Sequence, residues 1–332
     1  MMKNKKLKIL IAGAFGYGNL GDDLLRDTLI FLLKKKYGNQ VELYTDRPYP
    51  DKELIDYCDL RIIGPGGLLY DSNESHAEYF KQYMKPPYIM IGVGLQFIES
   101  FKEPEGFCVD AIKNSDLIIG REIKDLLLFE KYGKKNSVFI ESDIVFFNST
   151  LINYSVPYLK KNPHTTLCVG TNNDINFLLD HDFLTNDNNW GKINTIISYN
   201  IECDKILEWL RKMKNFQRTT IDFYYDTPQN VYNIIANTDL LITEKYHAGI
   251  MALKAGNVKV VTLIPDPSYK LRNIFPSLNI PEFIDNTEKY IKSIPLIKEI
   301  NGIPLKDIRK KSYDPLRHLD TYMGDKFDIY PL

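Results

Sequence analysis

Residues 8–25 read KILIAGAFGYGNLGDDLL, and this stretch decides the fold that we expect. Its apolar run, Lys8–Ala12, has the length of a buried strand and is too short to cross a membrane. The glycines after the run predict a sharp turn, and Asp22 and Asp23 suit the start of a helix, where the backbone dipole favours negative charge. A strand, a glycine turn and a helix in this order open a parallel α/β sheet.

The same alternation of apolar and amphipathic segments runs along the chain. Further strand candidates are 41–45, 60–63, 88–93 and 117–119 in the first half, and 166–170, 193–198, 219–223, 240–243 and 258–263 in the second. A polar, proline-containing stretch, 153–163, separates the halves, and 332 residues exceed what one hydrophobic core usually supports. We therefore predict two Rossmann-like parallel-sheet domains facing a central cleft. They span residues 1–155, with the glycine turns, and 164–300, with a tail, 301–332, that packs back on them.

The composition argues against several kinds of partner. The chain has 42 basic and 43 acidic residues, so its net charge of −1 creates no field that would attract nucleic acid or a membrane. No apolar run approaches the roughly 18 residues of a membrane span, which leaves at most a peripheral contact at the inner face of the membrane. The four cysteines form no C-x-x-C pair, so we expect reduced thiols, no metal site and a cytoplasmic location.

The first glycine turn has two interpretations. Gly16–Gly21 fits the G-x-G-x-x-G pattern of dinucleotide-binding folds, between a strand and a helix. The carboxylates of Asp22 and Asp23 oppose this assignment, because they lie where a pyrophosphate needs backbone N–H donors. The glycines either form a tight turn capped by the aspartates or face a ligand, and both interpretations carry equal weight. Asn19 is the residue that a purely structural turn explains least.

Two further glycine clusters lie at strand ends. Gly64-Pro65-Gly66-Gly67 comes after the third strand candidate, and Gly92-Val93-Gly94 comes at the end of the fourth. Glycines allow a backbone to approach a ligand closely. Together the three clusters leave little side-chain bulk along one rim of the first domain, as an open binding cleft requires, although sharp turns alone explain each cluster nearly as well.

Charged residues follow the strands at two places. Arg121 comes directly after a strand, where its guanidinium either binds a carboxylate or phosphate of a ligand or pairs with Glu122 or Asp125. His247, close behind Lys245, opens a helix after another strand and is suited to donate or accept a proton near neutral pH. A structural role is expected for the remaining histidines, which are His76, His164, His181 and His318.

These motifs form an ordered series. In sequence order they are Gly18-Asn19-Leu20-Gly21-Asp22, Gly64-Pro65-Gly66-Gly67, Gly92-Val93-Gly94, Arg121-Glu122 and Lys245-Tyr246-His247. The series resembles that of the polysaccharide pyruvyl transferase family, across residues 9–275. The resemblance implies a glycosyltransferase-B-like pair of domains with the acceptor on the N-terminal side. It also implies transfer of a pyruvyl group from phosphoenolpyruvate to hydroxyls of a surface polysaccharide of the cell envelope, such as an exopolysaccharide, or of its precursor. A pyruvate ketal forms, and no cofactor is needed.

The resemblance also assigns roles to residues. It implies that His247 is the general acid/base. It implies that Arg121 and Lys270 bind the donor, and Asn19, Gly66, Gly67 and Lys245 are expected as further donor contacts. Asp22, Asp71 and Trp190 are then expected to contact the acceptor, which is a glycan or a lipid-linked or nucleotide-linked sugar. Lys270 and Trp190 each have a plainer interpretation as solvated loop residues.

Three features depart from the family pattern. Lys245 stands where arginine is usual, which keeps the charge but loses the forked geometry of a guanidinium. Asp125 adds a negative charge near a predicted anion site, and the loop before Lys270 is a few residues longer than usual. Two alternatives therefore stay open: a nucleotide-sugar glycosyltransferase of the same architecture, and a non-catalytic relative.

Overall fold

The chain forms two compact units, each with its own parallel sheet. The first unit comprises Met1–Tyr17, Asp22–Asn148 and Glu299–Leu332, and the second comprises Gly18–Gly21 and Ser149–Lys298. This computed structural model describes residues 5–46, 51–70, 80–96, 106–152, 164–169, 195–198, 219–222, 227–243, 245–256, 258–261, 299–300, 303–310 and 312–332. The chain leaves the first unit shortly before the polar stretch of the sequence and returns to it at Glu299.

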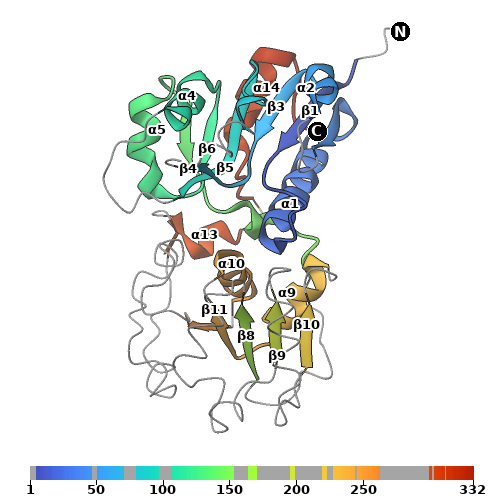
Figure 1. The fold of residues 1–332 in the computed structure, drawn as a ribbon, viewed down its shortest axis with the longest axis vertical. Helices are drawn as coiled ribbons and strands as arrows, with labels where there is room; N and C mark the ends of the chain where they lie inside the picture. Colours follow the sequence, from blue (N-terminus) through green and yellow to red (C-terminus); the bar gives the residue numbers. More distant parts are fainter. Residues whose placement is uncertain are drawn as a thin grey trace. The chain divides into compact units, whose positions relative to one another are not determined.

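The first unit is built on a seven-stranded sheet within the described ranges (Figure 1). Its strands follow the order β2 (Val41–Thr45), β1 (Leu7–Ala12), β3 (Leu60–Ile63), β5 (Tyr88–Gln96), β6 (Ile118–Gly120) and β7 (Val138–Ile140), and β4 (Gly66–Tyr70) also pairs with β5. All of these pairs are parallel. Ile9, Leu10 and Ile11 are completely buried, as expected for a central strand of a parallel sheet that is covered on both faces.

The first helix has the ends that the sequence predicts. The helical segments of this part are α1 (Leu20–Tyr37), η1 (Gly38–Gln40), α2 (Lys52–Tyr57), α4 (Phe107–Asn114), η2 (Ile123–Asp125), α5 (Leu126–Tyr132) and η3 (Ile144–Phe147). In α1, Asp22 and Asp23 lie in the first turn and three lysines lie in the last, so both ends complement the helix dipole. Its apolar stripe, with Leu25, Leu29 and Leu33, is buried in the core.

The C-terminal segment packs on the first unit. It consists of β13 (Glu299–Ile300), β14 (Ile303–Pro304), α13 (Leu305–Ile308) and α14 (Arg317–Phe327). Lys36 of α1 pairs with Asp320 of α14 at 2.8 Å, so these two helices lie side by side. The buried carboxylate of Glu141 accepts a hydrogen bond from Tyr313 and pairs with Arg317 at 2.9 Å. These polar contacts fasten the last segment to the sheet and to α1.

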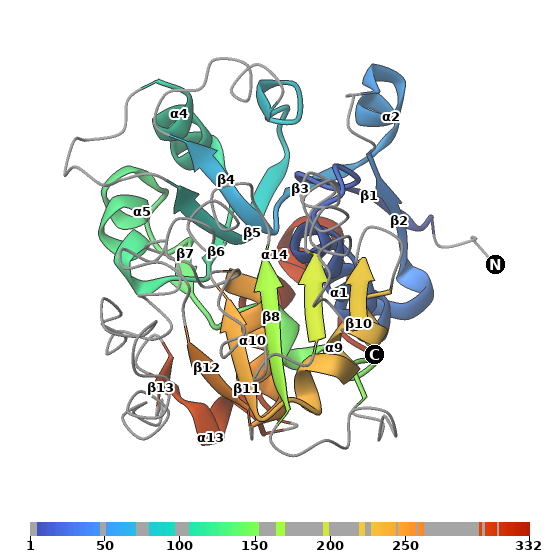
Figure 2. The same cartoon turned by 60° about the horizontal axis from the view of Figure 1, so that its bottom comes forward.

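The second unit has a five-stranded parallel sheet in the part that the structure describes (Figure 2). The strand order is β10 (Thr219–Asp222), β9 (Thr195–Ser198), β8 (Thr165–Val169), β11 (Leu240–Thr243) and β12 (Lys259–Val261). Two helices, α9 (Pro228–Ala236) and α10 (Tyr246–Ala255), pack against each other in this unit. All five strands coincide with the strand candidates of the second half to within a few residues.

Strands β4 and β7 are not among the strands predicted from the sequence. Gly66 and Gly67, predicted as part of a turn, begin β4 instead. Gly66 has a φ of +137°, and the register of β4 shifts against β5 directly after it. A glycine in this conformation lets the chain pair again immediately after the bend, which apolar periodicity alone does not indicate.

Each sheet has a point where the strand order reverses. In the first sheet the chain continues from β1 to β2 on one side and then to β3 on the other. In the second sheet the same reversal separates β8 from β11. Ligands of open α/β sheets bind outside the carboxyl ends of the strands at such switch points. The first two glycine clusters follow β1 and β3, and His247 follows β11, so each sheet places predicted site residues at its switch point.

Two smaller expectations concern cysteines and membranes. Cys58, Cys108 and Cys168 are buried free thiols within the described residues. No helix within the described ranges has both the length and the apolar character to cross a membrane.

Candidate functional site

His247 lies where β11 gives way to α10. The amide of Lys245 donates to Thr243 Oγ1 at 2.9 Å, which closes a short turn after the strand. Lys245 is the extended N-cap of α10, with φ −77° and ψ 122°, and His247 is the second helical residue. The imidazole is 8% exposed and meets the Tyr246 ring edge to face, with 5.0 Å between the ring centroids. The predicted order of strand end, cation, imidazole and helix is therefore present.

The first glycine motif adjoins this histidine within the second unit. A methyl group placed on Gly21 would lie 2.5 Å from His247 Nδ1 and 3.4 Å from Asn19 Oδ1. The Gly21 amide donates to Asn19 Oδ1 at 3.0 Å, so Asn19 caps the first turn of α1. The structure thus brings together Asn19 and His247, two residues that the sequence assigned to one site from opposite parts of the chain.

Arg121 belongs to a buried charge cluster of the first unit. Its side chain is 3% exposed, and its Nε lies 3.2 Å from Glu122 Oε1. Lys124 Nζ lies 2.7 Å from the other oxygen of Glu122. Gly94 makes room for this pair, because a methyl there would lie 3.0 Å from Arg121 Nε. Of the two interpretations of Arg121, pairing with Glu122 is what the structure contains, and binding of a ligand stays a prediction.

Asp125 completes the charge cluster and is 1% exposed. Burial first, and the charge of Glu122 second, raise the pKa of its carboxyl to about 7, against the opposing effects of Lys124, the Leu95 amide and Arg121. The Leu95 amide donates to Asp125 Oδ2 at 3.1 Å. From the sequence alone, Asp125 is expected to add a negative charge near the predicted anion site. In the folded chain this carboxyl is mostly protonated below pH 7.

Lys124 and Glu122 are cluster members that sequence reasoning did not assign to a site. Burial lowers the pKa of the Lys124 ammonium. A usable signal was present, because Arg121-Glu122-Ile123-Lys124-Asp125 contains four charged residues in five directly after a buried strand. Charges at such a position are close to the carboxyl edge of the sheet, where they are shielded from solvent.

Asp22, Gly66 and Gly67 lie at the switch point of the first sheet. A methyl placed on Gly66 would lie 3.6 Å from Asp22 Oδ1, so the Asp22 carboxylate faces the start of β4. Asp23 Oδ1 accepts the Gly16 amide at 3.0 Å. This bond supports the interpretation of the first glycines as a tight turn tied to an aspartate. Contact of Asp22 with an acceptor, and of Gly66 and Gly67 with a donor, stay predictions.

Three predicted site residues, Asp71, Trp190 and Lys270, lie outside the described residues. Within the ranges that are described, no three His, Cys, Asp or Glu side chains gather in a way that could hold a metal ion. Among the other histidines, His164 Nε2 lies 3.1 Å from Thr195 Oγ1, and His318 stacks on Phe139 with 3.6 Å between ring centroids. These two contacts are structural.

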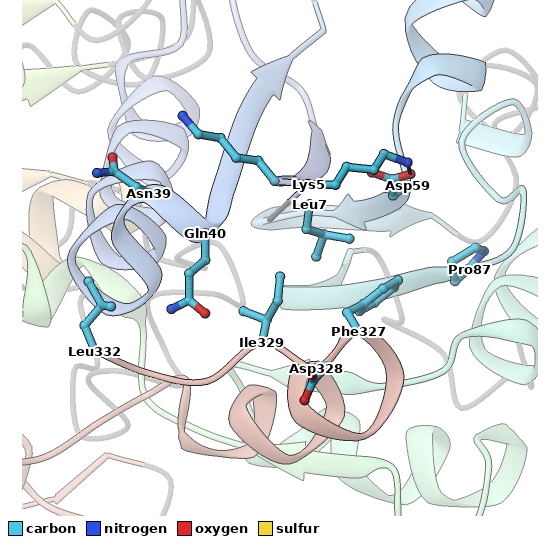
Figure 3. A pocket seen from close by; sticks show the side chains of 11 residues that line it. Lys5, Leu7, Asn39, Gln40, Asp59, Pro87, Phe327, Asp328, Ile329 and Leu332 are labelled. Atoms are coloured by element: carbon cyan, nitrogen blue, oxygen red, sulfur yellow. Dashed lines mark hydrogen bonds and ion pairs between the residues drawn. The ribbon is translucent and has the colours of Figure 1, made fainter. Parts of the chain in front are cut away.

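A cavity of about 800 Å³ opens at the amino-terminal edge of the first sheet (Figure 3). Leu7, Asp59 and Pro87 line it where β1, β3 and β5 begin, and Phe327 and Ile329 line it from the C-terminal segment. The glycine clusters lie at the carboxyl ends of these strands, which is the opposite edge of the sheet. The cavity therefore does not belong to the candidate site.

Comparison with known proteins adds a family and a fold. The model of a family described as polysaccharide pyruvyl transferase matches residues 19–266. No curated protein sequence matches the chain.

Several solved structures share the fold, and three of them are UDP-N-acetylglucosamine 2-epimerases. UDP-N-acetylglucosamine 2-epimerase from Rickettsia bellii aligns with a TM-score of 0.61 at 12% identity, covering 97% of this chain and 99% of that one. A putative enzyme of the same name from Listeria monocytogenes aligns at 0.59 and 10% identity, covering 98% and 97%. UDP-GlcNAc 2-epimerase from Neisseria meningitidis, bound to UDP-GlcNAc, aligns at 0.58 and 9%, covering 96% and 100%. At such identities the likeness establishes the fold alone, and it confirms the predicted glycosyltransferase-B-like class of two Rossmann-like units.

Proposed function

The chain belongs to the polysaccharide pyruvyl transferase family, and we propose that it transfers a pyruvyl group from phosphoenolpyruvate to two hydroxyls of a sugar, forming a pyruvate ketal. The observation that carries this proposal, beyond the family, is the environment of His247. The imidazole is buried at the carboxyl edge of a parallel sheet, at the start of a helix, and adjoins the Asn19–Gly21 motif. A buried imidazole held at a defined position is suited to move one proton there.

The proposed reaction needs one proton donor and an anion clamp. His247 donates a proton to the methylene carbon of phosphoenolpyruvate, which creates an oxocarbenium-like centre. One sugar hydroxyl adds to this centre and gives its proton back to His247. A second hydroxyl then displaces the phosphate, which leaves with the proton of that hydroxyl. The products are the pyruvate ketal of the sugar and inorganic phosphate, so atoms and charge balance without an oxidant or reductant.

The donor carries a phosphate and a carboxylate on a three-carbon skeleton. Such a ligand requires fixed cations and N–H donors rather than a large apolar pocket. Lys245, at the N-cap of α10 two residues before His247, is the nearest cation in sequence to the proposed acid/base. Arg121 and Lys270 are further proposed donor contacts, together with the amide groups around Asn19, Gly66 and Gly67. Asp22, Asp71 and Trp190 are proposed for the acceptor.

The acceptor is a sugar of a surface polysaccharide or of its lipid-linked or nucleotide-linked precursor. One observation favours including nucleotide sugars among the compounds to be tested. The structure from Neisseria meningitidis shares this fold and is described as bound to UDP-GlcNAc. The same observation supports a second candidate function, a glycosyltransferase that uses a nucleotide sugar as donor. The lysine at position 245, where arginine is usual in the family, is a second reason to consider this function.

The experiment measures phosphate release from phosphoenolpyruvate with and without sugar acceptors. We expect release that depends on an acceptor and that is abolished in His247→Ala. His318→Gln serves as a matched control, because it removes an imidazole that stacks on Phe139 in the first unit. Unchanged turnover in His247→Ala would remove the acid/base role. Transfer from a nucleotide sugar, with no use of phosphoenolpyruvate, would favour the second candidate.

A further inference from the structure

Gly21 occupies a helical position that gives no backbone reason for a glycine. It is the second residue of the 18-residue helix α1, and it is buried. Its φ lies outside the left-handed region, unlike that of Gly16 and Gly18 just before it. Glycine is among the least favourable residues in a helix, and alanine is the most favourable. A glycine here therefore calls for a reason outside the helix.

The space around Gly21 supplies that reason. A methyl group on Gly21 would lie 2.5 Å from His247 Nδ1 and 3.2 Å from His247 Cγ. The first distance is shorter than real Cβ contacts and the second is tighter than most of them, so the imidazole would have to move. The ring is 8% exposed and the Tyr246 ring meets it edge to face. A displaced ring could not simply swing into solvent.

We propose that Gly21 is a positioning residue for His247. The missing side chain lets the Nδ1 edge of the imidazole pack directly on Gly21, and this contact fixes the orientation of the ring. Nε2 is then the nitrogen that faces the substrate and moves the proton. Asn19 holds the turn in place through its bond to the Gly21 amide. Gly21 therefore serves the acid/base through the space that it leaves for the imidazole.

The catalytic part of this inference rests on the proposed function, but the packing part does not. The test compares Gly21→Ala with Gly324→Ala. Gly324 is a helical glycine of α14 at which a methyl would lie 2.9 Å from Tyr330 Cε1, and Tyr330 is 56% exposed, so its ring has room to move toward solvent. Both variants add the same methyl next to an aromatic ring, and only one of these rings is His247.

Two readouts are taken on the whole chain. In turnover of phosphoenolpyruvate we expect Gly21→Ala to lower kcat by about a hundredfold, the effect of moving a catalytic group by about 1 Å, with KM for the donor unchanged. We expect Gly324→Ala to retain the wild-type kcat. In spectra of protein with ¹⁵N-labelled histidine, we expect Gly21→Ala to shift the ring signals of His247 and to leave those of the other four histidines in place.

These readouts separate the two ideas. If the wild-type chain does not turn over phosphoenolpyruvate, the proposed function fails, while the spectra still decide the packing. Wild-type kcat together with unshifted His247 signals in Gly21→Ala would overturn the inference. If Gly21→Ala does not fold, the double variant Gly21→Ala/His247→Ala should fold, because the smaller side chain vacates the space. Failure of this double variant to fold would also overturn the inference.

Discussion

Replacement of Asp125 by asparagine should change how the stability of the chain depends on pH. Asp125 is 1% exposed, and burial is the first cause that raises its pKa from 3.8 to about 7, with the charge of Glu122 second. Between these values the unfolded chain has lost the proton and the folded chain still holds it. Unfolding then releases a proton, so the free energy of unfolding falls as pH rises, by about 1.4 kcal/mol per pH unit.

The magnitude follows from the two pKa values. The total decrease in the free energy of unfolding is about 4 kcal/mol and is complete above pH 7. About 2 kcal/mol of this decrease occurs between pH 5.5 and pH 7.5. Asparagine has nearly the same shape, and its carbonyl oxygen can accept the Leu95 amide as Asp125 Oδ2 does at 3.1 Å. Asparagine does not titrate, so the variant does not show this pH-dependent decrease in the free energy of unfolding. The free energy of unfolding of the variant minus that of wild type should therefore increase by about 2 kcal/mol between pH 5.5 and pH 7.5.

Urea denaturation followed by circular dichroism, at both pH values, measures this difference. Leu127→Ala on the neighbouring helix α5 is the control, because Leu127 is 78% exposed and the substitution changes no titratable group. The control should keep the same difference from wild type at both pH values. A stability difference between Asp125→Asn and wild type that does not depend on pH would refute the reasoning about the buried carboxyl.

Three further predictions address the site and the fold. His247→Gln should lower kcat by about 10²- to 10⁴-fold with little change in KM, and steady-state phosphate release measures it; a smaller loss in kcat would speak against proton transfer. Gly64→Ala should destabilise the chain by about 3 kcal/mol or more, because φ is +115° and the methyl would lie 2.3 Å from Ile91 O. Gly106→Ala, with φ +62° and no atom within 4 Å, should cost only about 1–2 kcal/mol in thermal denaturation, so equal losses would contradict the steric argument. Glu141→Ala should cost about 2–3 kcal/mol, because the buried carboxylate joins Tyr313 and Arg317 to β7, and limited proteolysis should then cut the C-terminal segment; unchanged resistance would count against this role.

The strands were largely predictable because their signal is local. A buried parallel strand is a short apolar run, and Lys8–Ala12 and Leu240–Thr243 can be recognised without knowing what covers them. Strand β4 was missed because its pairing depends on the positive φ of Gly66 and on a register shift against β5. Both are properties of the folded chain, and two glycines in sequence look the same in a turn and in a strand.

The sequence indicates candidate site residues but not the contacts that they make. His247 follows from a local pattern, a strand end with a cation and an imidazole at a helix start. The contact of Gly21 with His247 joins distant parts of the sequence, and only the fold reveals it. The sequence likewise gives Asp125 a charge, but the raised pKa arises from burial, which depends on how β5 and η2 pack. Long-range packing and desolvation are therefore what sequence reasoning lacked.

The central claim is the use of phosphoenolpyruvate as donor with His247 as acid/base. The most direct measurement incubates the protein with ¹³C-labelled phosphoenolpyruvate and sugar acceptors, and follows the methyl carbon of the label by NMR together with phosphate release. The account predicts a new ketal methyl signal on the sugar, one phosphate for each ketal, and neither product in His247→Gln. A ketal formed at the wild-type rate by His247→Gln, or sugar transfer from a nucleotide sugar with phosphoenolpyruvate left intact, would contradict it.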